Sequence, residues 1–525
     1  MVYDTIVVGA GMAGLTAAAY VARAGHSVLL CEKAETVGGL VRTFERQGIL
    51  YDGGIRAIEN AGIVRPMLAQ LGIEIEWLKS PVFIGIEDLR TEATRESGLE
   101  AYQRLLEELY PESHDEIAEL VRQITRVMEY MDVLYGIDNP ALIDLAQNPR
   151  FLLGTLLPWT IRYALAMPKI ASLQGPVSAH LRQFMQNESL LDIIAQHFFR
   201  DTPASFALSY FTLYFDYMYP RGGTGTLPHK MAAYITQQGG AIKTNCEIAV
   251  IDPTRHTVMD DAGNVSSYRQ LIWAADTKAL YSRLRLDHTT DPQVRRAIAL
   301  RENEIADKRG GDSVLTVFLG LELSPSYIQE RGGAHFFYTP SRLGQSQAGP
   351  IPATGEREEV QTWLERFLQL TTYEISCPAL RDPQMAPTGQ TGLVVSILFD
   401  YDLVERIREE GWYEAFKRFV ERAVVDILEK NVFPGLRASV VDCFSSTPLT
   451  MARLTNNTDG AITGWAFTND VVPAEHRTMR ITHAVRTPIP GVSQAGQWTF
   501  SPSGLPISVL TGKLAADRAI KLLGE

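Results

Sequence analysis

The sequence predicts an α/β protein in which a nucleotide-binding unit at the N-terminus is interleaved with a second, α+β unit. Residues 3–8 form an apolar strand that leads through G-x-G-x-x-G at residues 9–14 into an alanine-rich helix at residues 12–23. A second strand at residues 26–31 ends at the acidic Glu32. A chain of 525 residues is too long for one ordinary core, so two structural units are expected.

Each glycine of the loop has a separate role in binding a dinucleotide. Gly9 permits the tight turn, Gly11 leaves room for a pyrophosphate beside the backbone, and Gly14 lets helix and strand pack closely. Met12 and Ala13 open the helix, whose free N–H groups and partial positive charge suit a pyrophosphate. Strand, loop, helix and second strand follow in the order that gives the motif its meaning, so we expect these residues to bind a dinucleotide.

The acidic residue after the second strand is expected to bind the adenosine ribose. The Glu32 carboxylate can accept hydrogen bonds from the ribose hydroxyls, and it disfavours a 2′-phosphate. Lys33 follows it, and the chain continues to a glycine pair, Gly38 and Gly39, and to Arg42. The glycines allow the backbone to pass beside a cofactor, and the arginine can lie over its phosphates. A plain turn followed by a surface arginine is the alternative.

This extension resembles the glycine-pair motif of the large flavoprotein group that includes amine oxidases and carotenoid desaturases. The resemblance implies FAD as the cofactor, in preference to NAD. Residues 51–54 (YDGG) are similar to the same group's next approach to the flavin, at Gly53 and Gly54, although a hairpin turn would also explain this glycine pair. No second strand, GxGxxG and helix unit follows, so a separate NAD(P)H domain is not expected.

Two further segments carry the resemblance. Residues 220–225 (PRGGTG) resemble the segment at which carotenoid desaturases and isomerases re-enter the flavin domain. The resemblance implies that Ile248 then meets the adenine and that Ala275 ends the next flavin-domain strand. Residues 495–506 (AGQWTFSPSGLP) resemble the family's closing motif, where a helix N-terminus lies against the flavin and stabilises its reduced form. The motif implies cofactor contacts for Gly496, Gly504, Leu505 and Pro506, and a terminal amphipathic helix is the alternative.

Together these motifs are most similar to the group of phytoene desaturases, carotenoid isomerases and retinol saturases. The group implies a Rossmann-type FAD domain of residues 1–75, 216–300 and 450–525, and a substrate domain of residues 76–215 and 301–449. It also implies hydride transfer between FAD and a lipophilic polyene, by desaturation, saturation or cis-trans isomerisation. The electron acceptor or donor stays open.

Two rival functions stay open at this point. One is oxidation of an amine or another polar substrate, which is disfavoured by Gln497, where amine oxidases carry an acidic residue. The other is a flavin-bearing lipid carrier without turnover. Arg56, Tyr217 and Tyr219 are candidates to line the flavin face and the substrate, with a structural role as the alternative. The spacing of serines, histidines and carboxylates indicates no catalytic acid or base.

The segments between the strands predict a helical cap. Residues 98–135 carry charged and apolar residues at helical spacing. Residues 151–173 are strongly apolar, but prolines and basic residues interrupt them, so they are a poor transmembrane helix. Between Arg150 and Asn187 the chain has four basic residues and no acidic ones, which favours shallow insertion into an anionic bilayer surface. A wall of the substrate cavity is the alternative.

Composition and charge argue against several other classes of protein. A net charge of −12 argues against a nucleic-acid partner, because phosphate binding needs a positive surface. The four cysteines lie far apart and form no CxxC pair, so neither a metal site nor a redox dithiol is expected. The first strand begins at Val2 and leaves no room for a signal sequence. We therefore expect a cytoplasmic protein, peripheral on the inner face of the cell membrane if residues 151–173 insert.

Overall fold

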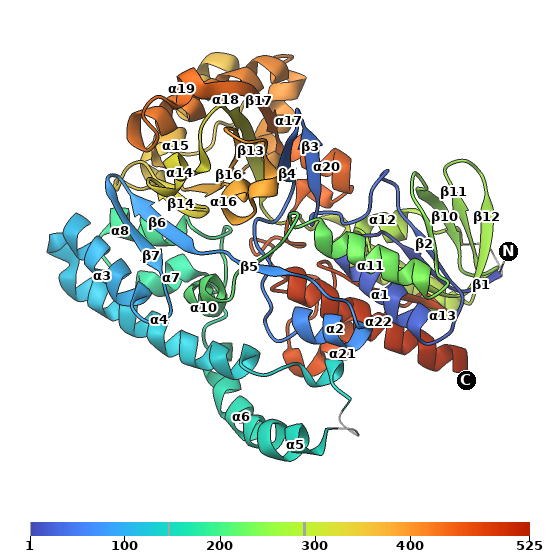
Figure 1. The fold of residues 1–525 in the computed structure, drawn as a ribbon. Coiled ribbons are helices and arrows are strands. Elements are labelled where there is room, and N and C mark those ends of the chain that lie inside the picture. The colour runs from blue at the N-terminus through green and yellow to red at the C-terminus, as the bar shows by residue number, and fades with distance from the viewer. Residues whose placement is uncertain (1, 145–147, 287–289, 525) are drawn as a thin grey trace.

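A computed structural model describes residues 2–144, 148–286 and 290–524, and it contains two large mixed sheets (Figure 1). The first sheet has the order β10-β11-β12-β1-β2-β9, with β18 also paired to β12. Pairing is parallel except along β10, β11 and β12. Its strands are β1 (Val2–Val8), β2 (Val28–Cys31), β9 (Ala241–Lys243), β10 (Ile248–Asp252), β11 (Thr257–Asp260), β12 (Val265–Trp273) and β18 (Val492–Gln494).

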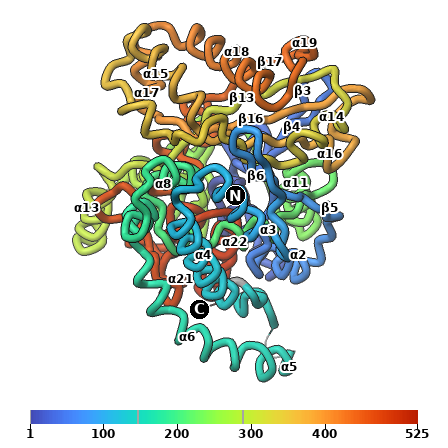
Figure 2. Tube along the Cα trace, turned by 90° about the vertical axis from the view of Figure 1, so that its left-hand side faces the viewer, coloured from blue at the N-terminus to red at the C-terminus, as the bar shows by residue number. Residues whose placement is uncertain are grey.

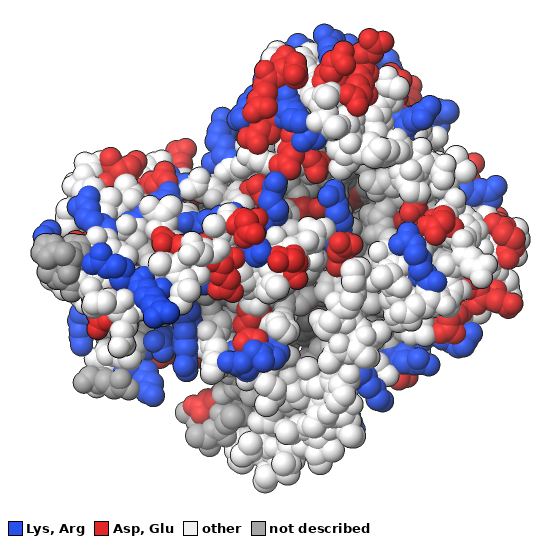
Figure 3. Space-filling model, turned by 180° about the vertical axis from the view of Figure 1, so that it is seen from behind, with Lys and Arg blue, Asp and Glu red and all other residues white. Residues whose placement is uncertain are grey.

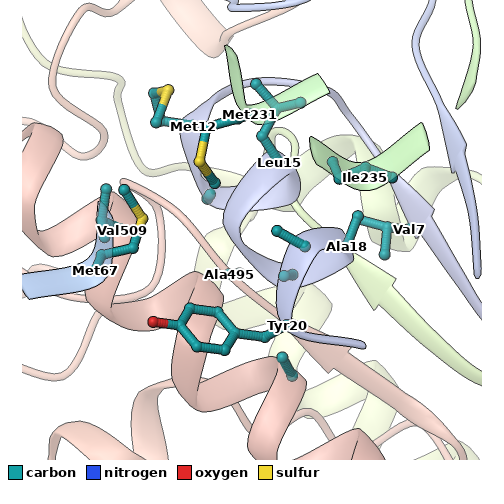
Figure 4. Packing of buried hydrophobic residues seen from close by; sticks show 14 of the residues in the cluster. Val7, Met12, Leu15, Ala18, Tyr20, Met67, Met231, Ile235, Ala495 and Val509 are labelled. Atoms are coloured by element: carbon teal, nitrogen blue, oxygen red, sulfur yellow. The ribbon is translucent and has the colours of Figure 1, made fainter. Parts of the chain in front are cut away.

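The helix α1 (Met12–Arg23) is the centre of the nucleotide-binding unit. Every residue from Met12 to Ala22 is buried, because α1 packs on the sheet, on α11 (Thr226–Gln237) and on α22 (Leu505–Gly524) (Figure 4). The small alanine side chains of α1 allow the sheet and both helices to pack closely around it. A Cβ at Gly512 would lie 2.3 Å from the Ala13 carbonyl oxygen, so α1 and α22 approach with their backbones close.

The second sheet has the order β17-β13-β16-β15-β14-β6-β7 and is antiparallel except between β6 and β14. One side packs on α15 (Arg357–Leu370), α17 (Tyr401–Glu409) and α18 (Tyr413–Asn431). Its strands are β6 (Val82–Ile86), β7 (Leu89–Ala93), β13 (Ser313–Leu321), β14 (His335–Thr339), β15 (Tyr373–Ser376), β16 (Thr391–Phe399) and β17 (Val440–Ser446).

A helical layer packs against β6 and β7, where the sequence predicts a cap. It consists mainly of α3 (Gly98–Leu109), α4 (His114–Tyr135), α8 (Glu188–Ala195) and α10 (Tyr210–Phe215), whose apolar faces share one core with the two strands. Other elements are the helices α2 (Val64–Leu71), α7 (Val177–Leu181), α9 (Ala204–Ala207), α12 (Thr277–Ser282), α13 (Pro292–Ala306), α20 (Pro448–Thr455) and α21 (Ile481–Ala484), and the strands β5 (Trp77–Lys79) and β8 (Met218–Pro220).

The chain crosses between the two units several times. The strands of the first sheet come from residues 1–75, 216–300 and 450–525, and those of the second sheet from residues 76–215 and 301–449. Residues 1, 145–147, 287–289 and 525 belong to these ranges and lie outside the described residues.

One hairpin of the N-terminal segment packs on the second sheet. It is formed by β3 (Thr43–Arg46) and β4 (Ile49–Asp52). Tyr51 shares an apolar cluster with Phe318 of β13, and the Arg46 guanidinium lies 2.5 Å from the Asp442 carboxylate of β17. The domain boundary at residue 75 therefore does not describe all contacts of this segment.

A helical arm projects from the lower edge of the molecule in Figures 1 and 2. It runs through α5 (Pro149–Phe151), a π-helical turn (Leu152–Leu156) and α6 (Leu157–Ala171). In the view from behind, its surface is mostly white, which marks residues other than Lys, Arg, Asp and Glu (Figure 3). Tyr163, Ala166 and Ile170 are buried against the rest of the protein. The opposite side carries exposed leucine and isoleucine side chains at a spacing of four, namely Leu153, Leu157, Ile161 and Leu165.

Candidate active site

A cavity of about 440 Å³ lies between the two units and is lined by both. One end is formed by the β1–α1 loop, the end of β2 and the N-terminus of α22. The other end is formed by α10 and strands β14, β15 and β16 of the second sheet. This volume is typical of cavities that hold small molecules.

The glycine loop forms the first wall of the cavity. Gly9, Gly11, Met12 and Ala13 line it, and a Cβ at Gly11 would meet no atom within 4 Å. Gly14 does not line it: a Cβ there would lie 1.8 Å from the Gly9 carbonyl oxygen. Gly14 is therefore placed as a packing residue, as expected from its place in the motif, and its predicted contact with the cofactor stays a prediction.

The nucleoside end of the cavity contains Glu32, Lys33, Ile248 and Ala275. The Glu32 carboxylate accepts hydrogen bonds from the backbone N–H groups of Ala10 (2.6 Å) and Ala34 (2.9 Å). Each carboxylate oxygen keeps a further lone pair that can accept from a ribose hydroxyl. The Lys33 ammonium donates to the Arg453 carbonyl oxygen at 3.0 Å, so this lysine also holds the wall together.

Arg42 supplies an uncommitted positive charge beside the glycine pair Gly38 and Gly39. All three line the cavity, and no carboxylate of the described residues forms an ion pair with Arg42. Burial lowers the pKa of its guanidinium. A half-buried cation without a counter-ion fits a phosphate group. Gly53 allows this placement, because a Cβ there would lie 2.8 Å from Arg42 Nε.

The C-terminal motif closes the cavity from the other side. Gly496, Gly504 and Leu505 line it, and the Gly496 N–H donates to Thr511 Oγ1 at 2.9 Å. Pro506 is buried in the first turn of α22 and does not line the cavity, and its predicted contact with the cofactor stays a prediction. The N-termini of α1 and α22 thus both face one cavity, which also holds Arg42. Open space at Gly11, a free guanidinium and two helix N-termini fit FAD.

The flavin-face candidates separate into two groups. Arg56 and Tyr217 line the cavity, as does the glycine pair Gly53 and Gly54. Tyr219 is fully buried in β8 and does not line it, because its hydroxyl donates to Asp52 Oδ2 at 2.6 Å. This placement favours the structural alternative for Tyr219, and its contact with the flavin or substrate stays a prediction.

Arg56 joins the two units at the middle of the cavity. Its guanidinium donates to the carbonyl oxygens of Asp52 (3.0 Å) and Gly54, and to Ser396 Oγ of β16 at 2.7 Å. Burial lowers its pKa, and the nearby carboxylate of Glu374 acts in the opposite direction. Arg56 thus fixes the glycine pair against the second sheet.

Asp52 is a second connecting residue, and it is completely buried. Besides the Tyr219 hydroxyl, its carboxylate accepts from the Thr224 N–H, the Thr224 hydroxyl and the Thr43 hydroxyl, each at 2.9 Å. The loop at residues 222–225, which the sequence links to re-entry into the flavin domain, is thereby tied to the glycine pair by one carboxylate.

Beyond the glycine pair the cavity becomes an aromatic chamber, which the sequence does not predict. We use this name for the cavity walls formed by Phe198, Phe206, Tyr210, Tyr217, His197, His335 and Phe337. The rings pack on one another: the His335 and Tyr217 centroids are 5.5 Å apart and nearly parallel, and those of His197 and Phe337 are 4.6 Å apart. The residues come from distant segments, so no local spacing reveals them.

One carboxylate of the chamber is hydrogen-bonded to a histidine. Glu374 Oε1 lies 2.9 Å from His335 Nε2. Burial raises the pKa of Glu374, but the hydrogen bond from His335 and the charges of Arg56 and Arg381 outweigh it, so the pKa lies below its usual value. Burial also lowers the pKa of His335, and it lowers that of His197 to about 4. The chamber therefore holds a charged Glu374 and two neutral imidazoles near pH 7.

A second carboxyl, Glu59, has its pKa shifted in the opposite direction to that of Glu374. It lines the same cavity, and burial and the neighbouring Asp216 raise its pKa to about 7. Asp216 is itself held in place by the backbone N–H groups of Asn60 and Ala61, each at 3.0 Å. A carboxyl with this pKa is half protonated at neutral pH.

Comparison with known proteins agrees with this geometry. The family described as flavin-containing amine oxidoreductases matches residues 12–520. Human all-trans-retinol 13,14-reductase is 24% identical over 98% of this chain and 85% of its own length, and the lycopene-forming phytoene desaturase of Pantoea ananas is 22% identical over 98% of each chain. The predicted resemblance to this group is confirmed.

Solved structures show the same fold. Cyclohexylamine oxidase from Brevibacterium oxydans IH-35A superposes with a TM-score of 0.61, covers all of both chains and is 15% identical in sequence. At this identity the likeness concerns the fold alone. The family match and the site together confirm that the cofactor is FAD.

Proposed function

Because the chain belongs to the family of flavin-containing amine oxidoreductases, we propose that it transfers hydride between FAD and a lipophilic polyene. FAD supplies the hydride-transfer chemistry when bound. The observation that carries the proposal is the continuity of the cavity from the glycine loop to the aromatic chamber. Aromatic walls suit a flat conjugated chain, and relatives that match nearly the whole length are named for retinol and phytoene.

Within this site the chain's own residues orient a substrate and exclude water. Arg56 holds the glycine pair, and the stacked rings of Tyr217, His335 and Phe337 define the chamber wall. Oxidation of an amine is less well supported, because an ammonium group beside Glu374 would also face Arg56 and Arg381. Desaturation, saturation and isomerisation share these requirements and differ in the direction of electron flow.

The test is an anaerobic spectrum of FAD-loaded protein mixed with liposomes that carry a partly saturated carotenoid precursor. A desaturase bleaches the oxidised flavin band while longer-wavelength polyene bands appear. A saturase or isomerase shows no bleaching, but converts a conjugated polyene when FAD has first been reduced with dithionite. Bleaching by soluble amines, with both polyenes untouched, would contradict the proposal.

We further propose that the arm rests on an anionic bilayer surface. None of residues 151–173 lines the cavity, which supports this proposal over a role in the cavity wall. The exposed fractions of Leu153, Ile161 and Leu165 are 66%, 63% and 68%, and such a stripe is typical of an interfacial helix. No helix among the described residues is both long and apolar enough to cross a bilayer. The arm would therefore place the protein peripherally, on the inner face of the cell membrane.

Replacing Leu153, Ile161 and Leu165 together with serine is expected to weaken binding to phosphatidylglycerol vesicles by at least about tenfold, which needs the loss of only about 1.4 kcal/mol. Vesicle pelleting measures the effect. The control is serine at Leu300 and Leu343, whose exposed fractions of 62% and 56% are similar but which lie elsewhere. Equal pelleting of both variants would contradict a membrane role for the arm.

A further inference from the structure

The cavity contains one carboxyl group without a partner. Among the described residues that line it, Glu32 accepts two backbone N–H groups, Glu247 lies 2.5 Å from the Arg283 guanidinium and Glu374 lies 2.9 Å from His335. Asp276 also lines it and accepts from Ala279 and Thr458. Among the described carboxyl groups that line the cavity, Glu59 alone has neither an ion pair nor a hydrogen bond.

Burial and the nearby Asp216 carboxylate both disfavour a negative charge on Glu59. The groups that face it are the Asp216 carboxylate and the tyrosines of the chamber wall and α10, Tyr210, Tyr214 and Tyr217. No lysine, arginine or histidine among the described residues acts on it. Asp216 keeps its position because its carboxylate accepts two backbone N–H groups beside Glu59. Such surroundings keep a carboxyl neutral and able to donate a proton.

Glu59 is also on the reacting side of the site. It follows the glycine pair by five residues, and both the pair and Glu59 line the same cavity as Tyr210 and Tyr217. Glu374, in the same chamber, has the opposite environment, with two arginines and a histidine near it. Two carboxyls with opposed environments in one site indicate that one is an acid–base group and the other a fixed charge.

We propose that Glu59 is the catalytic residue that moves the proton accompanying hydride transfer, which rests on the function proposed above. In saturation, the O–H bond of Glu59 breaks and a C–H bond forms at one alkene carbon. The neighbouring carbon receives a hydride from reduced FAD, and the π bond is lost. Anionic reduced FAD would supply the hydride and become oxidised FAD, while Glu59 is left as a carboxylate that takes up a proton from solvent. In desaturation, the same groups act in reverse, and Glu59 accepts the proton.

The protonation state of Glu59 can be measured without turnover. Infrared difference spectra of the oxidised FAD-loaded protein between pH 5 and pH 9 are expected to show a carboxyl C=O band that titrates near pH 7. Glu59→Gln should remove this band, and Glu374→Gln should keep it. A band that persists in Glu59→Gln, or is absent from the wild type, would overturn the proposal.

Thermal stability gives a second readout of the same group. The folded-state pKa is raised from 4.5 to about 7, so ionising Glu59 costs stability as the pH rises from about 4.5 through 7. Glu59→Gln is therefore expected to raise Tm relative to the wild type at pH 8 and to leave it nearly unchanged at pH 4.5. Equal Tm differences at the two pH values would contradict a neutral Glu59.

Turnover then separates this role from the proposed function. In single turnover of dithionite-reduced protein with a conjugated polyene, Glu59→Gln is expected to lower the rate at least about 100-fold, with polyene binding unchanged, and Glu59→Asp to recover part of it. A wild-type rate in Glu59→Gln would overturn the proposal and leave the function intact. Conversion of no polyene by the wild type, with amine oxidation in its place, would refute both. If benzylamine binds the wild type and not Glu59→Gln, Glu59 is an ammonium site and the proposal is wrong.

Discussion

Replacing Gly11 with valine is expected to give a folded but colourless protein. The backbone of Gly11 has φ −68° and ψ 176°, which valine adopts without strain, and a Cβ there would meet no atom within 4 Å. The new side chain would instead project into the cavity where the pyrophosphate must approach the backbone. We expect FAD affinity to fall at least about 100-fold, on the order of 3 kcal/mol, as measured by flavin absorbance after gel filtration.

Two other glycines serve as controls for this change. Gly154 lies in the arm with open space around its Cβ position, so Gly154→Val should keep both the fold and the yellow colour. Gly14→Val should lose the fold as well as FAD, because its Cβ would overlap the Gly9 carbonyl oxygen at 1.8 Å. Circular dichroism separates the two kinds of loss. Full flavin occupancy in Gly11→Val would refute the dinucleotide site.

Removal of the Asp52 carboxylate is expected to have the largest effect on stability. In Asp52→Ala the Thr224 N–H and the hydroxyls of Tyr219, Thr224 and Thr43 lose their acceptor. Of these residues, Tyr219 and Thr224 are fully buried. Each buried group left without a partner costs about 1–3 kcal/mol, so we expect the free energy of unfolding in urea to fall by about 3 kcal/mol or more.

Glu188→Ala is the matched control, because it removes a carboxylate whose ion pair with Arg182 is exposed on both sides. An exposed pair contributes about 0–1 kcal/mol, so this variant should stay near the wild type. Asp52→Asn should fall between the two, since the amide keeps one acceptor oxygen. If Asp52→Ala were as stable as Glu188→Ala, Asp52 would not connect the re-entry loop to the glycine pair.

The nucleotide end of the site could be predicted from sequence because its requirements are local. A tight turn, a close approach and a helix N-terminus each specify residues within a few positions, as at Gly9, Gly11 and Gly504. The motif also predicts the packing role of Gly14, whereas it does not show that Pro506 supports the wall from behind and does not line the cavity.

The aromatic chamber could not be predicted in this way. His335 begins β14 and Glu374 lies in β15, and the pairing of these two strands brings them together. His197 follows α8 and reaches the chamber by packing against Phe337. Tyr217 and Tyr219 are equivalent in the sequence, yet one faces the chamber and the other is turned inward by its hydrogen bond to Asp52. The function of a tyrosine here depends on a carboxylate 167 positions earlier.

The contact between α1 and α22 has a consequence for how the protein is made. The first helix leaves the ribosome hundreds of residues before Leu505–Gly524 is synthesised, and until then its alanine-rich surface lacks one of its three neighbours. The cavity wall formed by Gly504 and Leu505 is absent for the same period. We therefore expect FAD binding to be completed only after translation of this segment, and we expect a nascent chain stalled before it to expose apolar surface to chaperones and proteases.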